Sequence, residues 1–399
     1  MKKTYFWQTA LMAGALLFGF TACSNDDNDA QQQNNNEERT LTIALNAGNI
    51  MRSTNFHSDP GTAKENAISS LTIALFDNND NVVNITDFAA TAAGDVKAWG
   101  DSSDPASGTI TVTVSTQGLQ SGYKVMAVAN TTAGKFNSAT TLTQFKDIKN
   151  TIDDALDAGS DVEKDTNLPM LGVGTIATPS PAITGVDFKA DIKLYHMVAK
   201  VSIEKLDRAF SGIYSAATFT VKDVYLKNVP SAQPFWYTPS TETVVGSDTK
   251  PYLGAGSGVD LTDNTKKLFF YTMPNNQTDD KATKIIIKGE FDPDGAGSAT
   301  ATTVYYPIYL DYVAPATPGE AGTAATGALP GYTNFDGSGI VTGGRTPKVV
   351  YPNDWYKISV TLKAVGTTDE DVDLDPQAVQ VNVTAQDFTE TSQVVTFGN

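Results

Sequence analysis

In the stretch TLTIALNA, residues 40–47, apolar residues alternate with polar or small ones. Successive side chains of an extended strand point to opposite faces, so Leu41, Ile43 and Leu45 share one face. The stretch therefore predicts a β-strand that buries one face in a core.

Alternating stretches of this kind recur along the chain, separated by clusters of Asp, Asn, Gly and Pro. They predict strands at residues 71–76, 109–115, 124–129, 199–203, 218–226, 268–272, 284–291, 303–310, 356–363 and 379–385. Helical spacing is clear only at residues 141–156. Many short strands with few helices predict an all-β protein. A length of 399 residues predicts two β-sandwich domains that meet near residues 179–191.

The N-terminus has the pattern of a lipoprotein signal peptide. Lys2 and Lys3 precede an apolar run at residues 10–20, which is too short to cross a bilayer and ends just before Cys23. We therefore expect residues 1–22 to be removed and Cys23 to carry acyl chains such as palmitate. Several chains anchor stably, because each buried methylene adds roughly 0.8 kcal/mol of membrane affinity.

Behind this cysteine lies a polar and acidic stretch, SNDDNDAQQQNNNEE at residues 24–38. It lacks the apolar residues needed to form a core, so residues 23–39 are predicted to be a disordered tether. Such a tether holds the folded part away from the membrane.

The composition excludes several classes of function. A net charge of -17 argues against nucleic-acid binding, which needs clustered Lys and Arg. The two histidines, His57 and His196, offer little for a zinc site or a histidine-dependent catalytic triad. Cys23 is the only cysteine, so an internal disulfide is impossible. We expect no cofactor, no metal and no catalytic site.

Two groups of residues still allow a binding site. The acidic run at residues 369–375 could hold calcium through alternate Asp oxygens, or it could be a solvated loop between strands, which we favour. The pair Phe235 and Trp236 could stack on a sugar or pack in a core, and we favour packing.

The chain has alternating apolar strands near both of its ends. The last one carries Val379, Val381 and Val383, and the segment after it contains further large apolar residues. Near the other end, a polar loop that contains Arg52 follows the strand of residues 41–47. A strand that is joined to its domain by a cleavable loop can be replaced by a strand of another chain.

At these residues the chain resembles the fimbrillin family, the major structural subunits of Bacteroidetes fimbriae, or type V pili. The resemblance extends over nearly the whole chain after Cys23 and lies in the order of short motifs. These are the strand, Arg and strand succession of residues 41–75, VMAVAN at 125–130, YHMVAKV at 195–201, NDWYKISV at 353–360 and the final valine strand.

The resemblance implies two tandem transthyretin-like β-sandwich domains and a lipoprotein precursor on the outer membrane. An Arg-specific protease would remove the first strand, with Leu41, Ile43 and Leu45, by cutting between Arg52 and Ser53; Arg39 is the second choice. The resulting groove would be filled by the C-terminal segment of a neighbouring subunit. Its donor residues would be Val379, Val381, Val383, Phe388, Val395 and Phe397.

These expectations define the domains of the chain. Residues 1–22 would be the signal peptide and 23–39 the tether, followed by the removable strand and cleavage loop at 40–52. The N-terminal sandwich would span 53–188 and the C-terminal sandwich 189–399. The result would be a non-enzymatic homo-polymer at the cell surface, with accessory tip and anchor subunits, that mediates adhesion.

Two alternatives remain at this point. The first is a surface-anchored glycan-binding lipoprotein that does not polymerise, for which a tether, β-sandwiches and Phe235 with Trp236 would also be suitable. The second is a secreted hydrolase with a carboxylate pair, but no pair in the sequence stands out.

Overall fold

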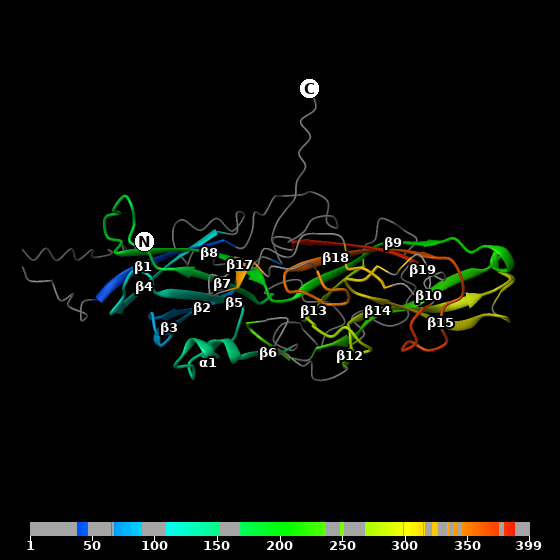
Figure 1. Cartoon of the computed structure of the whole chain (residues 1–399), viewed down its shortest axis with the longest axis horizontal. Helices are drawn as coiled ribbons and strands as arrows, with labels where there is room; N and C mark the ends of the chain where they lie inside the picture. The colour runs from blue at the N-terminus through cyan, green and yellow to red at the C-terminus, as the bar shows by residue number, and fades with distance from the viewer. Residues whose placement is uncertain are drawn as a thin grey trace, which may run out of the picture. The chain divides into compact units, whose positions relative to one another are not determined.

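The alternating stretches form the strands of two β-sandwiches in the computed structural model (Figure 1). The structure describes residues 38–46, 65, 68–89, 109–151, 168–230, 232–236, 248–250, 268–297, 299–313, 315, 321–325, 333–334, 339–340, 345–374 and 379–387. All of them belong to one compact unit within Asn36–Asn399.

The elements of the first half are β1 (Glu38–Asn46), β2 (Ser70–Phe76), β3 (Val82–Ala89), β4 (Thr109–Gln117), β5 (Lys124–Ala129), α1 (Leu142–Asp147), β6 (Lys149–Thr151), β7 (Met170–Thr175) and β8 (Phe188–His196). Those of the second half are β9 (Ala199–Arg208), the 3-10 helix η2 (Gly212–Tyr214), β10 (Thr218–Val229), β11 (Ala232–Pro234), β12 (Asp248–Lys250), β13 (Leu268–Thr272), β14 (Lys284–Asp292), β15 (Thr302–Tyr309), β16 (Thr333–Asn334), β17 (Gly339–Ile340), β18 (Asp354–Leu362) and β19 (Val379–Asp387).

The first sandwich is formed by one continuous seven-stranded sheet, whose strands follow the order β3-β2-β5-β7-β8-β1-β4. It encloses one core, and its strands β2 and β5 are buried on their second face too, under α1 and the phenylalanines around it. For this reason β2 reads SLTIALF, with Leu71, Ile73 and Leu75 in one core and Ala74 and Phe76 in the other.

The second sandwich consists of two four-stranded sheets, β13-β9-β18-β19 and β12-β10-β14-β15. One continuous core contains residues from both sheets, including Val201, Ile287 and Ile358. The prediction of an all-β fold with two β-sandwiches is therefore confirmed.

The helix and the division between the sheets differ from the sequence prediction. Within the described residues 141–151 the predicted helix is only α1, because Lys149–Thr151 pairs as β6 with Ala232–Pro234, a partner that lies about eighty residues further along the chain. Strand β8 belongs to the first sheet, so the sheets divide after His196, whereas the sequence placed the division between residues 188 and 189.

Buried polar contacts join the two sandwiches. The Nζ of Lys200 on β9 lies 2.6 Å from Glu65 Oε1, and both side chains are almost fully buried. The backbone N–H of His196 donates to Asn353 Oδ1 at 3.0 Å. These contacts fix the end of β8 against the strands that carry β19.

Candidate functional site

The candidate site is the slot that β1 fills in the first sheet. Strand β1 lies between β8 and β4 (Figure 1), parallel to the first and antiparallel to the second. Ile43 is opposite Val112 of β4 and Ala190 of β8. Both edges of β1 are therefore paired, and its removal would leave two rows of unpaired backbone groups.

The inward face of β1 fills a row of apolar pockets. Leu41, Ile43 and Leu45 are 0% exposed and belong to the core that also contains Val112 and Ile192. Full burial of such a side chain contributes about 1.5–3 kcal/mol, so the three together hold β1 with roughly 5–9 kcal/mol. The structure thus buries all three residues that the sequence assigned to the displaced strand.

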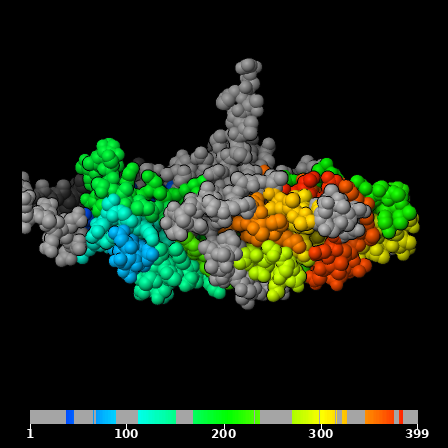
Figure 2. All heavy atoms as spheres, in the orientation of Figure 1, coloured from blue at the N-terminus to red at the C-terminus, as the bar shows by residue number. Residues whose placement is uncertain are grey.

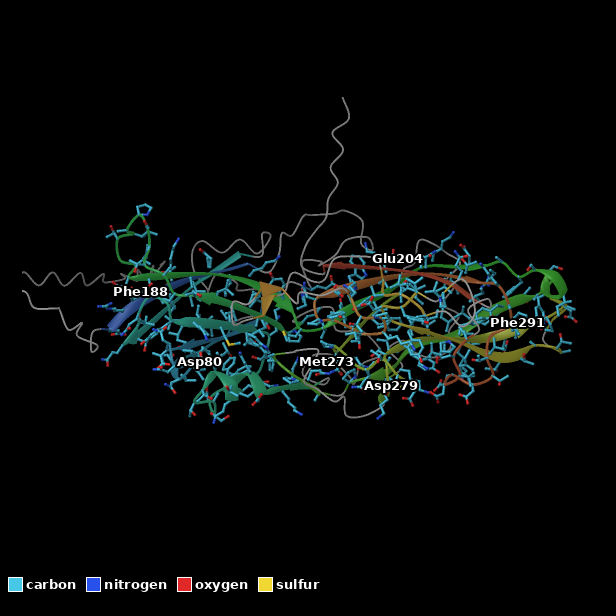
Figure 3. The ribbon with its side chains drawn as sticks, in the orientation of Figure 1. Asp80, Phe188, Glu204, Met273, Asp279 and Phe291 are labelled. Carbon is cyan, nitrogen blue, oxygen red and sulfur yellow. The ribbon has the colours of Figure 1, made fainter. Side chains whose placement is uncertain are left out.

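Asp187, just before β8, binds the beginning of β1. Its Oδ2 accepts hydrogen bonds from the Thr40 N–H at 2.8 Å and the Thr40 hydroxyl at 3.0 Å. Beside it, the guanidinium of Arg39 lies 5.8 Å from the ring centre of Phe188, which Figure 3 labels at the start of β8. The N–H of Thr40, its hydroxyl and the charge of Arg39 hold the pKa of Asp187 below its ordinary value.

We expect acid to loosen β1. Because the pKa of Asp187 is lowered in the folded state, its bonds to Thr40 stabilise the docked strand at pH values above the ordinary 3.8. This contribution is lost as the pH falls through the lowered pKa. The protection factors of the β1 amides, which correct for the change in the intrinsic exchange rate with pH, should fall in that range, and should fall less in an Asp187→Ala variant. Equal acid sensitivity in both proteins would contradict the assignment.

Strand β4 depends on β1 for its place in the sheet. Among the described strands, β4 forms its ladder with β1 alone and ends the sheet order. On the other side of the slot, β8 also pairs with β7. The slot therefore has one wall that remains paired without β1 and one wall that does not.

Two glycines of β7 allow β8, the wall of the slot that stays paired without β1, to lie close to β7. A Cβ on Gly172 of β7 would lie 2.4 Å from the carbonyl oxygen of Lys193, and one on Gly174 would lie 3.0 Å from that of Asp191. Only residues without a side chain allow β7 and β8 to approach this closely.

The proposed donor residues lie partly in a strand of their own sandwich. β19 pairs antiparallel with β18, and Val381 and Val383 are 8% and 2% exposed in the second core. Val379 begins this strand. Phe388, Val395 and Phe397 lie outside the described residues. To act on another subunit, β19 must therefore leave β18.

The processing residues have different positions. Arg39 is inside β1, opposite Thr116 of β4, whereas Cys23, Arg52 and Ser53 lie outside the described residues. Within the described ranges, no helix is long and apolar enough to cross a membrane.

Lysines and tyrosines of the second sandwich form ion pairs and hydrogen bonds with the acidic run. Glu370 and Asp371 lie 2.7 and 2.6 Å from Lys227 Nζ, and Asp373 accepts from the Tyr309 hydroxyl at 2.7 Å. Figure 2 shows this orange-red segment at the surface beside the yellow of β15. Among the residues that the structure describes, no group of side chains could hold a metal ion. The described part of the run favours the loop over the calcium site.

The aromatic pair packs inside the protein. Phe235 is 1% exposed and contacts the ring of Phe136 at 5.1 Å, and Trp236 is partly buried with Lys146 Nζ 3.9 Å above its ring. A sugar platform needs an open aromatic face, so this arrangement favours packing.

Asp187 was missed by the sequence prediction. Its partner Thr40 is 147 residues away, and only the parallel pairing of β1 with β8 brings the two together. The one available signal was the strict alternation of residues 188–194, which marks β8 as a strand.

Residues 40–196 match a family described as "Major fimbrial subunit protein (FimA)". The match starts in β1 and ends with β8, so it contains the slot and both of its walls. The resemblance to the fimbrillin family is thus confirmed for this part of the chain. The family is one of structural subunits, in agreement with the prediction of a non-enzymatic protein.

Solved structures share the fold over most of the chain. A candidate cell adhesion protein from Bacteroides eggerthii is 18% identical, with a TM-score of 0.56, and the similarity covers 88% of this chain and 96% of that one. A fimbrilin from Porphyromonas gingivalis is 14% identical, with a TM-score of 0.51 and the same coverage of both chains. A candidate cell adhesion protein from Parabacteroides distasonis is 15% identical, with a TM-score of 0.52 and coverage of 88% and 99%. No curated protein matches the sequence.

Proposed function

We propose that this chain, which matches the major fimbrial subunit family over residues 40–196, is a structural subunit of a surface fimbria that polymerises by strand exchange. Proteolysis after Arg52 removes β1, and β19 with the segment behind it fills the slot of the next subunit. The observation that carries the proposal is β1 itself, which is paired on both edges and buried at three alternate side chains.

The slot offers an incoming strand two kinds of interaction. The ladders of β8 and β4 would accept and donate backbone hydrogen bonds, and the pockets of the apolar row would take alternate side chains. Each subunit would donate one strand and accept one. Such a head-to-tail contact does not close on itself, so repetition produces a filament.

The side chains also explain why cleavage must come first. β1 fills the pockets with Leu41, Ile43 and Leu45, whereas β19 offers only valines, each one methylene smaller. Three missing methylenes correspond to roughly 2.4 kcal/mol of lost burial. In addition, β1 is part of the same chain and loses no translational freedom when it docks. An intact β1 therefore prevents exchange.

The position of the cut follows from what must be released. A cut after Arg39 would leave the three apolar residues of β1 attached to the body, and Arg39 lies inside a paired strand, where a protease has poor access. A cut after Arg52 separates the whole strand from the chain. This difference supports Arg52 over Arg39.

We expect Arg52→Lys to abolish processing by an Arg-specific protease and with it polymerisation, while Arg39→Lys is processed like wild type. N-terminal sequencing should find Ser53 at the new end of the wild-type and Arg39→Lys proteins, and size-exclusion chromatography should follow the polymer. If Arg52→Lys polymerises normally, the cut lies elsewhere. If correctly cut wild type stays monomeric, strand exchange is wrong.

Export as a lipoprotein through Cys23 completes the proposal. The acyl chains would hold the precursor on the outer membrane until the cut removes them together with β1. Accessory tip and anchor subunits would then end the fibre, and adhesion would be a property of the assembled filament.

A further inference from the structure

Asp187 marks the entrance of the slot. Its exposed carboxylate accepts both the N–H and the hydroxyl of Thr40 in the precursor. When β1 leaves, these acceptor positions become open to the next strand. Because the group is charged, its hydrogen bonds are stronger than those between neutral groups.

The contacts that β1 makes in the slot define which strand can replace it. Beside Asp187 stands a residue with a hydroxyl, and inward apolar side chains follow at every second position, as in Thr40, Leu41, Ile43 and Leu45. The residues between them face outward. Any replacing strand has to satisfy the same succession.

β19 shows this succession when it is read from its C-terminal side. Thr384 is followed in this direction by Val383, Val381 and Val379, with Asn382 and Gln380 between the valines. The inward and outward faces agree with its present sheet, where Val383 is 2% exposed while Asn382 and Gln380 are exposed.

Other registers fit less well. In the direction of β1, the same three valines would put Ala378, which has no hydroxyl, beside Asp187. A shift by two residues would put Ala385 where Leu45 fills its pocket, and would leave a cavity. If the reversed strand shifts by two residues, so that Val381 takes the place of Leu41, Gln377 would be buried in the pocket of Leu45.

We propose that Asp187 sets the direction and register of the incoming strand. In this arrangement β19 of a second copy enters antiparallel to β8, opposite to β1, and the Thr384 hydroxyl donates to the Asp187 carboxylate. Entry in this direction makes the pairing with β8 antiparallel and the pairing with β4 parallel. Antiparallel pairing is slightly more stable per residue, so the better pairing forms on β8, which also stays paired with β7. The inference rests on the proposed strand exchange.

The test is a double-mutant cycle on cleaved full-length protein, with the initial polymerisation rate as the readout. Asp187→Ala and Thr384→Val should each slow assembly about 3-fold to 10-fold, the range of one net hydrogen bond. The double variant should be no slower than the slower single variant, because both changes remove the same contact. Asp191→Ala removes an exposed carboxylate from β8, close to Asp187 along the chain, and should assemble like wild type.

The outcomes separate this inference from the proposed function. If wild type polymerises and the two effects multiply, or Thr384→Val has no effect, Asp187 does not select this register, although strand exchange stands. If cleaved wild type does not polymerise at all, the proposed function itself fails.

Discussion

Cleavage that removes β1 should free β4 from the sheet. Among the described strands β4 pairs with β1 alone, so the cut should accelerate the hydrogen exchange of those amides of residues 109–117 that point toward β1 by on the order of 100-fold or more. The amides of β8 that face β7 should remain protected, because that pairing is intact. Exchange measured by mass spectrometry on the precursor, the cleaved monomer and the polymer would show the difference.

The polymer provides the control for this prediction. A strand that fills the slot restores the ladder, so residues 109–117 should become protected again on assembly. Unchanged protection of β4 in the cleaved monomer would mean that other contacts hold it, and that the slot does not open as described.

A Val383→Asp change should abolish polymerisation and also weaken the second sandwich. Val383 is 2% exposed in the core, and a buried carboxylate there should lower the free energy of unfolding by roughly 4 kcal/mol or more. A milder Val383→Ala change should lower it by about 2 kcal/mol and keep the fold. Calorimetry of the precursor measures these losses, and Asn382→Ala, on the exposed face of β19, should change little.

The Val383→Ala variant distinguishes the ability of a subunit to donate β19 from its ability to accept a strand in its slot. Its slot is intact, so the cleaved Val383→Ala protein should still accept a wild-type strand while it donates poorly. Added to cleaved wild type, it should shorten the polymers in proportion to its share. If folded Val383→Ala protein leaves polymer length unchanged, β19 is not the donor.

The pattern of apolar residues along the sequence predicted most of the fold for a local reason. Strands β5 and β13 have the predicted limits of 124–129 and 268–272, because one continuous apolar run forms each strand. The short strand β7 was missed, since Gly172 and Gly174 interrupt its pattern, and their function is to let β8 approach. The helix was predicted too long because the pairing partner of β6 lies far along the chain.

The same limit applies to the site. The buried row of β1 could be read from its own residues, since alternation is a property of one strand. The dependence of β4 on β1 and the bond from Thr40 to Asp187 could not, because they arise from pairing between distant segments. The junction of Glu65 with Lys200 belongs to this class too.

Site-specific disulfide formation would show whether β19 of one subunit enters the slot of another. Cys23 is the only cysteine and would be removed with β1, so the cleaved chain can carry one new cysteine at a chosen place. Thr113 is exposed on β4 opposite Thr42, and Gln380 and Asn382 are exposed on β19. Cleaved Thr113→Cys protein would be mixed with cleaved Gln380→Cys or Asn382→Cys protein and oxidised. Thr220→Cys, exposed on β10, would be the control.

If β19 of one subunit fills the slot of another, a disulfide dimer should form between the Thr113→Cys protein and at least one β19 variant, because a disulfide needs Cα atoms within about 7 Å. It should not form with the control or before cleavage. Polymers that assemble without this disulfide, or that give it equally with the control, would contradict strand exchange through the slot of β1.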